Sequence, residues 1–247
     1  MKILLVTVAG KSSRFSRSLG RTCLKCIYHP GNISESLLYR LLHLDMDFDK
    51  YIIVGGFMYE QLKLAMEEHF SDISGKVILV NNEKYGEYGS GYSLYRGFQE
   101  AAGWDFSEIL FAEGDLFVDR GTFLEISRSE KDIITCNKEM ISAEKSVVFY
   151  FDKEYKVHYV YDASHNMLNI TEPFRSIHNS GQVWKFRRPG LLRDIYGNMR
   201  EQEWQGTNLV FIQKYFQSLM PEEYDIVRFK RWVNCNTIAD FEEARNG

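Results

Sequence analysis

The sequence predicts an α/β fold of three layers, with a mostly parallel but mixed central sheet between two layers of helices. In the first half, short apolar runs alternate with segments of helical periodicity, which gives four consecutive strand–helix units. Strand signals dominate the second half, and the change falls near residue 130. We therefore expect one domain over residues 1–247, made of a first half, 1–130, and a second half, 131–247.

The first half contains four predicted strands, each of which ends in a glycine or a polar turn. Residues 2–8 form a continuous apolar run, as expected of a strand buried on both faces. The other three strands are predicted over 51–54, 77–80 and 108–112.

Three helices are predicted between these strands, from the spacing of their apolar residues. They cover residues 32–46, 57–70 and 90–102, and Ser34 is the expected cap of the first. Because residues 30–32 read Pro-Gly-Asn, we expect no helix directly after the glycine that ends the first strand.

The second half is predicted to hold mainly strands, followed by helices. The strands are expected at 132–136, 146–151, 156–161, 167–171 and 181–186, with a turn over 162–166. Helices are expected at 189–199 and 207–219, then a strand pair at 224–229 and 231–235, and a last helix at 238–245.

Composition and charge restrict the function. The formal net charge of −4 argues against nucleic-acid binding, which needs clustered cations. No apolar stretch reaches the roughly 20 residues of a membrane span, so we expect no membrane partner. Four cysteines include a Cys23–Cys26 pair without the second pair of a zinc site, which favours reduced thiols and a cytoplasmic protein. The oligomeric state is not indicated.

The loop after the first strand has the composition of a phosphate-binding loop. Gly10, Ser12 and Ser13 are small, so that backbone N–H groups and hydroxyls can approach phosphate oxygens closely. Arg14 can add a bidentate contact, and Lys25 is near enough in sequence to return to the same phosphates. The glycine and lysine spacings of a P-loop and of a dinucleotide fingerprint are both absent.

This segment resembles the signature of nucleotidyltransferases with a GT-A-like, Rossmann-like fold, which is Ala-Gly-x-Gly-[Ser/Thr]-Arg followed by Pro-Lys. The matching residues are Ala9, Gly10, Ser13, Arg14 and Lys25. Ser12 stands where a second glycine is usual, and Leu24 where proline is usual. The resemblance implies that the loop wraps the phosphates of an NTP, with Arg14 and Lys25 as the catalytic cations.

Three later segments resemble the same family in the same order. Asn81 and the group Gly89, Ser90 and Ser93 correspond to the region that reads the nucleoside, where we expect free donors at a helix N-terminus. Asp115 corresponds to the aspartate that holds Mg²⁺. Asn236 replaces the acidic residue that usually completes this metal site, and the amide brings no charge.

The resemblance implies an enzyme that transfers an NMP group from an NTP, CTP being favoured, to a small phosphorylated acceptor, with Mg²⁺ as cofactor and release of pyrophosphate. It also makes 1–130 the nucleotide-binding half and 131–247 the acceptor-binding half. Two acceptors stay open, a phosphocholine-like molecule and a sugar 1-phosphate. Aromatic and acidic residues could form a cage for a quaternary ammonium group, and the expected contacts are Trp184, Glu203 and Trp204.

Two other readings remain. A nucleotide-sugar glycosyltransferase would share the fold, but it usually carries Asp-x-Asp where this chain has Asp115-Leu116-Phe117. A catalytically silent nucleotide-binding protein is the other reading, because Ser12, Leu24 and Asn236 depart from the usual pattern.

Overall fold

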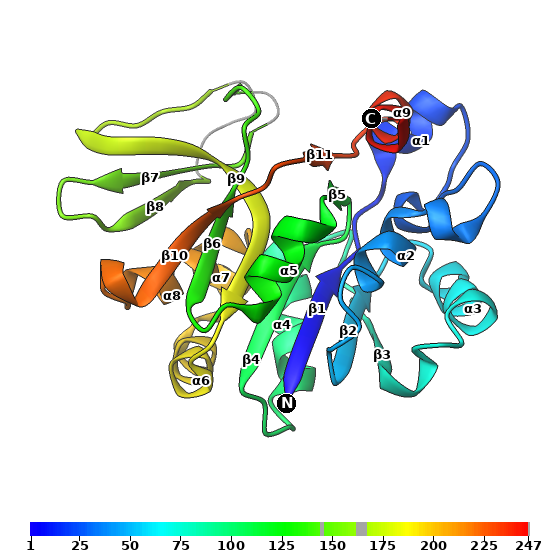
Figure 1. Cartoon of the computed structure of the whole chain (residues 1–247), viewed down its shortest axis with the longest axis horizontal. Helices are drawn as coiled ribbons and strands as arrows, with labels where there is room; N and C mark the ends of the chain where they lie inside the picture. Colours follow the sequence, from blue (N-terminus) through cyan, green and yellow to red (C-terminus); the bar gives the residue numbers. More distant parts are fainter. Residues whose placement is uncertain (144–145, 162–166, 247) are drawn as a thin grey trace.

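The computed structural model describes residues 1–143, 146–161 and 167–246, and it has the predicted three layers (Figure 1). The strand order of the central sheet is β10-β6-β9-β4-β1-β2-β3. Strand β9 is antiparallel to both of its neighbours, whereas the other adjacent strands in this order are parallel. The bounds are β1 Lys2–Thr7, β2 Lys50–Gly55, β3 Val77–Asn81, β4 Glu108–Glu113, β6 Asp132–Cys136, β9 Phe174–Phe186 and β10 Tyr224–Arg228.

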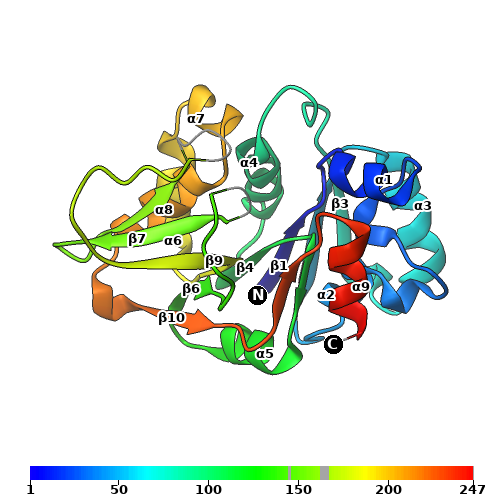
Figure 2. The same ribbon diagram turned by 90° about the horizontal axis from the view of Figure 1, so that it is seen from above.

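Helices cover both faces of the sheet, because alternate residues of the inner strands point to opposite sides. On β1, Leu4 and Val6 face one layer while Ile3 and Leu5 face the other, and all four are fully buried. The first layer holds α2 Leu37–Leu42, α3 Tyr59–His69 and α5 Arg120–Arg128. The second holds α4 Ser90–Ala101, α6 Pro189–Asn198 and α8 Leu209–Gln217. Figure 2 shows α4 and α5 on opposite sides of β1 and β4.

A smaller group of strands extends from the sheet through β9. The first part of β9 pairs with β7 (Val148–Asp152), which pairs with β8 (Val157–Val160). The second part of β9 pairs with β4 and β6. The strand predicted to begin at residue 181 therefore begins at Phe174, because its mostly polar first part pairs with β7. The strand predicted over 167–171 is wrong, since these residues form no ladder, and the turn predicted over 162–166 lies outside the described residues.

The N-terminal helices differ from the prediction in two places. Helix α1 (Ser13–Leu19) starts soon after Gly10, although no helix was expected there. Its sequence is mostly polar and buries only Phe15, so apolar periodicity could not indicate it. The helix predicted over 32–46 is a 3₁₀ turn, Ile33–Glu35, followed by the short α2. Ser36, and not Ser34, caps α2, because its hydroxyl accepts from the Tyr39 N–H at 3.3 Å.

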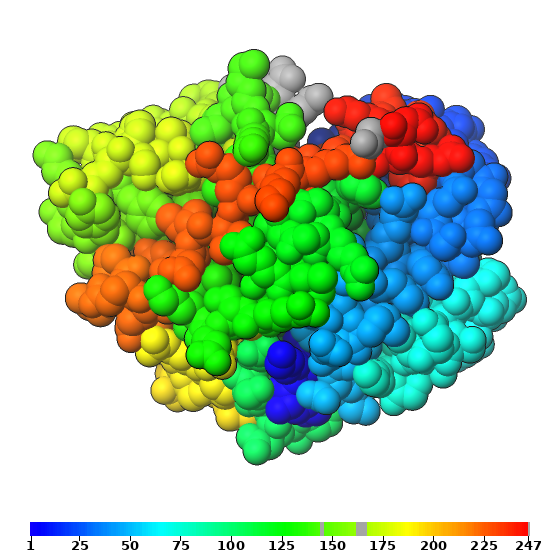
Figure 3. All heavy atoms as spheres, viewed as in Figure 1, coloured from blue at the N-terminus to red at the C-terminus, as the bar shows by residue number. Residues whose placement is uncertain are grey.

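The C-terminal segment crosses the molecule from β10 to helix α1 (Figure 3, orange to red). It contains β11 (Trp232–Asn234) and α9 (Ile238–Asn246), and α9 packs against α1. Strand β11 does not pair with β10 but with β5 (Leu116–Val118), which follows β4 directly. The remaining short elements are α7 Glu201–Gln205 and the 3₁₀ turns Lys25–Ile27, Ser74–Lys76 and Pro221–Glu223.

All four cysteines are unpaired, and three of them, Cys26, Cys136 and Cys235, are buried. Within the described parts of the chain, no helix has the length and apolar character needed to cross a membrane.

A buried lysine ties β9 to β4 and to the end of α5. The Lys185 side chain is 1% exposed, and its ammonium group lies 3.2 Å from the Glu108 carboxylate. It also donates to the carbonyls of Ser127 and Ser129, at 2.7 Å each. Burial lowers the pKa of Lys185, while Glu108 opposes that shift. The charge is thus kept in the core by a full set of acceptors.

We expect Lys185→Met to lower the free energy of unfolding by about 3 kcal/mol, because two buried carbonyls and Glu108 lose a donor. Urea unfolding measures this. Lys131→Met is the matched control, since the Lys131–Asp225 ion pair is about half exposed, and it should change stability by less than ~0.5 kcal/mol. A loss below about 1 kcal/mol for Lys185→Met would contradict the described role.

Candidate functional site

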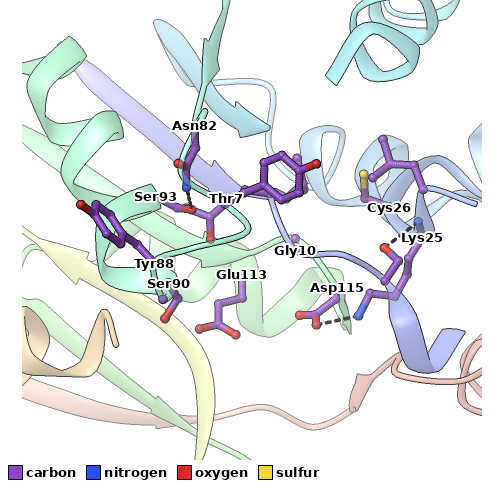
Figure 4. A pocket seen from close by; sticks show the side chains of 17 residues that line it. Thr7, Gly10, Lys25, Cys26, Asn82, Tyr88, Ser90, Ser93, Glu113 and Asp115 are labelled. Carbon is purple, nitrogen blue, oxygen red and sulfur yellow. Dashed lines mark hydrogen bonds and ion pairs between the residues drawn. The ribbon is translucent and has the colours of Figure 1, made fainter. Parts of the chain in front are cut away.

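A cavity of about 300 Å³ opens at the carboxyl ends of β1 and β4. The chain runs from β1 to β2 and β3 on one side, while β4 lies on the other, so this is a topological switch point of the sheet. Figure 4 shows the side chains that converge there. The lining residues are Thr7, Val8, Ala9, Gly10, Ser12, Leu24, Lys25, Cys26, Asn82, Tyr85, Tyr88, Gly89, Ser90, Ser93, Glu113, Gly114 and Asp115.

The loop after β1 forms one wall of the cavity, as the sequence predicts for Ala9, Gly10 and Ser12. Gly10 is exposed, and a Cβ atom there would meet no other atom within 4 Å, so a ligand has room beside the backbone. Ser12 adopts a left-handed conformation with φ of 54°, which favours glycine. Its hydroxyl accepts from the Lys25 N–H at 3.3 Å. Ser13 begins α1 and does not line the cavity.

Lys25 and Asp115 meet in the cavity, 90 residues apart in sequence. The Lys25 ammonium lies 2.8 Å from Oδ2 of Asp115, and the two side chains are 14% and 24% exposed. The other carboxylate oxygen, Oδ1, is buried and accepts no hydrogen bond from any residue that the structure describes. An unpartnered carboxylate oxygen beside an open cavity suits a hard cation such as Mg²⁺, which takes one or two carboxylates plus phosphate oxygens.

Glu113 supplies a second carboxylate that the sequence did not indicate as a site residue. It ends β4, lines the cavity, and accepts from the Asn208 side-chain amide at 2.9 Å. Burial, and then the negative charge of Asp115, raise the pKa of Glu113. Figure 4 shows both carboxylates on one side of the cavity. A bound cation would offset their mutual repulsion.

The N-terminus of α4 forms the opposite wall, but its donors are not free as expected. The N–H groups of Gly89 and Gly91 donate to the carbonyls of Gln205 and Gly206, at 2.7 and 3.0 Å. A Cβ atom on Gly89 would lie 2.2 Å from the Gly206 oxygen, so this close contact requires glycine. The Ser90 hydroxyl is likewise engaged, since it accepts from the Asn208 N–H at 3.1 Å.

Asn82, rather than the predicted Asn81, reaches the cavity from the end of β3. Asn81 continues the ladder opposite Gly55, and successive residues of a strand point to opposite sides. Asn82 is fully buried, and its amide donates to the Ser93 hydroxyl at 2.9 Å. Ser93, predicted to contact the nucleotide, lines the cavity, and its hydroxyl already accepts this hydrogen bond.

Arg14 and Asn236, which the sequence placed with Lys25 and Asp115, line a neighbouring hollow instead. The Arg14 guanidinium donates to the side-chain oxygen of Asn236 at 2.9 Å. The oxygen expected to ligate Mg²⁺ is thus engaged by a cation. The residue before Asn236 nevertheless contacts Asp115, because the Cys235 N–H donates to the Asp115 carbonyl at 2.9 Å. Of the expected constellation, Lys25 and Asp115 come together, while Arg14 and Asn236 form a separate pair beside them.

The expected aromatic cage is not formed by the residues proposed for it. Trp184 is fully buried in β9, stacks on Phe111, and donates to the Tyr159 hydroxyl at 2.7 Å. Trp204 packs in the core on the α4 side of the sheet. Glu203 lies 2.5 Å from the ammonium of Lys214, away from both hollows. These large aromatic side chains stabilise the core because burial of their area is favourable.

Solved structures share this fold over nearly the whole chain. The inositol-1-phosphate CTP transferase from T. maritima is 16% identical with a TM-score of 0.67, and the match covers 100% of this chain and 97% of that one. CTP:phosphocholine cytidylyltransferase from Streptococcus pneumoniae is 14% identical, with a TM-score of 0.64 and coverage of 99% and 97%. The nucleoside-diphosphate-sugar pyrophosphorylase from Vibrio cholerae RC9 is 16% identical, with a TM-score of 0.67 and full coverage of both chains.

The fold is therefore that of the nucleotidyltransferases to which the sequence motifs bear a resemblance. Residues 21–247 match a family model described as "Domain of unknown function (DUF6564)". The chain belongs to that family. Among curated proteins, none matches it significantly in sequence.

The left-handed conformation of Ser12 can be tested by two substitutions. Ser12→Ala keeps the backbone strain and removes the hydroxyl acceptor, so we expect a loss of about 1 kcal/mol in unfolding free energy. Ser12→Gly also loses the hydroxyl but relieves the strain, so it should be about 1 kcal/mol more stable than Ser12→Ala. Chemical denaturation of the two variants checks the difference, and a glycine variant less stable than the alanine variant would contradict the assigned conformation.

Proposed function

We propose that the protein is a nucleotidyltransferase that moves an NMP group from an NTP to a small phosphorylated acceptor and releases pyrophosphate. The observation that carries this proposal is the Lys25–Asp115 pair, which lies beside a loop of small residues and leaves Oδ1 of Asp115 without a partner in the described parts of the chain. The fold shared with enzymes of this class supports it. The cavity lies where sheets of this type bind ligands.

Oδ1 of Asp115 would hold Mg²⁺, with the Glu113 carboxylate on the same wall available to it directly or through water. Bound there, the ion supplies positive charge against the phosphate oxygens of the nucleotide. The oxygen ligands fit this ion, whereas sulfur or imidazole ligands would be expected for zinc.

The chain itself contributes position and charge. The loop from Ala9 to Ser12 would accept the phosphates, since its backbone is open to the cavity. Lys25 would stabilise the negative charge that grows on the transferring phosphoryl group. The Cys26 thiol also lines the cavity, but burial raises the pKa of Cys26 to about 12, so it stays protonated and is a poor nucleophile. We therefore infer direct in-line attack by an acceptor phosphate oxygen.

Support for CTP comes from two sources. The spacing around Ser90 and Ser93 resembles the cytidylyltransferase branch of the family. Two of the three compared proteins are named for their use of CTP. We also propose that both halves of the chain act as one domain, because β4 of the first half pairs with β9 of the second.

A second candidate is a nucleotide-binding protein without turnover. Two observations favour it. The N–H groups of Gly89 and Gly91 at the N-terminus of α4 are engaged within the protein, and Arg14 lies outside the cavity. Binding of an NTP without pyrophosphate release, over a panel of phosphorylated acceptors, would identify it.

We expect Lys25→Ala and Asp115→Ala each to reduce pyrophosphate release from CTP and Mg²⁺ by at least about 100-fold, because each removes charge that acts on the phosphates. Lys131→Ala, at a distant exposed ion pair, is the control and should keep activity within about 2-fold. Circular dichroism and thermal unfolding show whether the variants fold. Full activity in either folded site variant would refute the proposal.

A further inference from the structure

The neighbouring hollow has the composition of a binding site of its own. It measures about 490 Å³ and lies between residues that follow β6, the middle of β9, and the segment from β11 into α9. Figure 3 shows the segment after β6 (green) and α9 (red) facing each other at the top of this face. Arg14 lines the hollow, and Ser12, two residues earlier, lines the first cavity. A molecule in the hollow would thus lie beside the phosphate-binding loop.

Two amide oxygens buried in its wall accept no hydrogen bond from the part of the chain that the structure describes. Asn179 is 6% exposed, and its side-chain oxygen accepts from no residue that the structure describes. The same holds for the side-chain oxygen of Asn234. Both residues line the hollow. An unsatisfied buried polar group costs about 1–3 kcal/mol, so a ligand that supplies donors here would recover that free energy.

Gln182, a residue with a strained backbone, holds the Asn234 side chain by a hydrogen bond. Gln182 is 1% exposed and has a left-handed backbone with φ of 55°, which is unfavourable for this side chain. Its side-chain oxygen accepts from the Asn234 amide at 3.2 Å, and its own amide nitrogen has no partner among the described residues. Strain of this kind persists where the surrounding structure enforces it, commonly next to ligand sites. Gln182 is therefore a positioning residue for Asn234.

The polar groups in the wall of the hollow can form hydrogen bonds with the hydroxyl groups of a ligand. A hydroxyl both donates and accepts, so it satisfies an amide presented by either its oxygen or its nitrogen. Ser142 and Ser146 also line the hollow and can exchange hydrogen bonds with further hydroxyls. Trp232 adds an aromatic surface, with its indole N–H already donating to the Gly181 carbonyl at 2.8 Å. Such a mixture of one aromatic surface and several fixed polar groups is typical of small-molecule sites.

A quaternary ammonium group would fit this hollow poorly. It needs several aromatic faces, and among the described lining residues only Trp232 offers one. Oδ2 of Asp240 is engaged, because it accepts from the N–H groups of Asn236 and Thr237 and from the Thr237 hydroxyl. Glu139 and Glu243 are exposed, so water screens their charges.

The end of the hollow near the first cavity suits a phosphate. The Arg14 guanidinium is exposed and makes no hydrogen bond in the described structure other than the one to Asn236. It keeps donors for a phosphate monoester, in the bidentate geometry that arginine provides. A phosphate held there and a polyhydroxyl body toward Asn179 and Asn234 would fill the hollow from one end to the other.

We propose that this hollow binds a phosphate monoester of a polyhydroxyl compound, such as a sugar or a cyclitol, and selects it against phosphocholine. This inference rests on the proposed function in one respect, which is that the bound molecule is the acceptor of the NMP group. Selection over phosphocholine arises because hydroxyl groups can donate to the two unpartnered amide oxygens, whereas a quaternary ammonium group has no N–H to donate.

Isothermal titration of the full chain, with and without Mg²⁺ and a non-hydrolysable CTP analogue, tests the proposal. The probes are glucose 1-phosphate, inositol 1-phosphate, phosphocholine and inorganic phosphate. We expect at least one of the two polyhydroxyl phosphates to bind at least 10-fold more tightly than phosphocholine and inorganic phosphate. Equal or tighter binding of phosphocholine, or no binding of either polyhydroxyl phosphate in both conditions, would overturn the inference.

Substitution of Asn179 locates the binding. Asn179→Ala should weaken the polyhydroxyl phosphate at least 10-fold and leave inorganic phosphate and the CTP analogue within about 2-fold. Asn198→Ala is the control, since this exposed amide donates only to the carbonyl of Asp194 on its own helix. If Asn179→Ala fails to fold, Asn234→Ala, expected to have the same effect, replaces it. Unchanged affinity in a folded variant would overturn the assignment.

The experiments distinguish a failure of the proposed function from a failure of the inference about the hollow. If glucose 1-phosphate binds in an Asn179-dependent way but no acceptor supports pyrophosphate release from any NTP, the hollow is a polyhydroxyl phosphate site and the enzyme proposal is refuted. If pyrophosphate is released with phosphocholine and not with the polyhydroxyl phosphates, the enzyme proposal stands and the inference about the hollow is wrong.

Discussion

The ion pair between Lys25 and Asp115 joins the parts of the chain on which the site depends. Lys25 belongs to the segment after α1, and Asp115 follows β4. The Asp115 carbonyl also accepts from the Cys235 N–H, so the C-terminal segment is attached at the same point. Three segments that are distant in sequence thus meet at one residue, Asp115, through its side chain and its backbone carbonyl. Since the pair is largely shielded from water, removal of either charge leaves the other poorly solvated, which makes the arrangement specific.

The two hollows differ in how their polar groups are satisfied. In the first cavity, Ser90, Ser93 and Asn82 are bonded within the protein, and Oδ1 of Asp115 has no partner among the described residues. In the second hollow it is the neutral amide oxygens of Asn179 and Asn234 for which the described structure offers no donor. An unpaired carboxylate oxygen favours a bound cation, whereas an unpaired neutral amide oxygen favours a neutral donor such as a hydroxyl group or water. The chemistry of each hollow therefore follows from which buried atoms the fold leaves unsatisfied.

Much of the fold could be predicted because burial on both faces leaves a clear apolar run, as in residues 2–8. Gly10, Lys25 and Asp115 were found because family motifs mark them. The partnership of Glu113 with Asn208 has no local signal, since the two are 95 residues apart. Trp184 was misassigned because an aromatic residue in a strand looks the same in sequence whether it faces a cavity or the core. Most of residues 174–180 carry polar side chains, and Phe174 and Ile177 alone give no clear strand pattern, so this part of β9 was recognised only from its pairing with β7.

Under the proposed function, the engaged N-terminus of α4 limits which groups could recognise the base of a nucleotide. Gly89 and Gly91 give their N–H groups to the chain between α7 and α8, and the absence of a side chain on Gly89 allows that contact. A helix N-terminus normally offers such donors to a ligand. Here the donors stabilise the second half of the chain against the first. A ligand in this cavity would then gain less from these backbone donors, and the aromatic residues Tyr85 and Tyr88 lie on its wall. Selectivity by stacking and shape is weaker than selectivity by fixed hydrogen bonds, because removing a hydrogen-bond partner leaves a buried group unpaired.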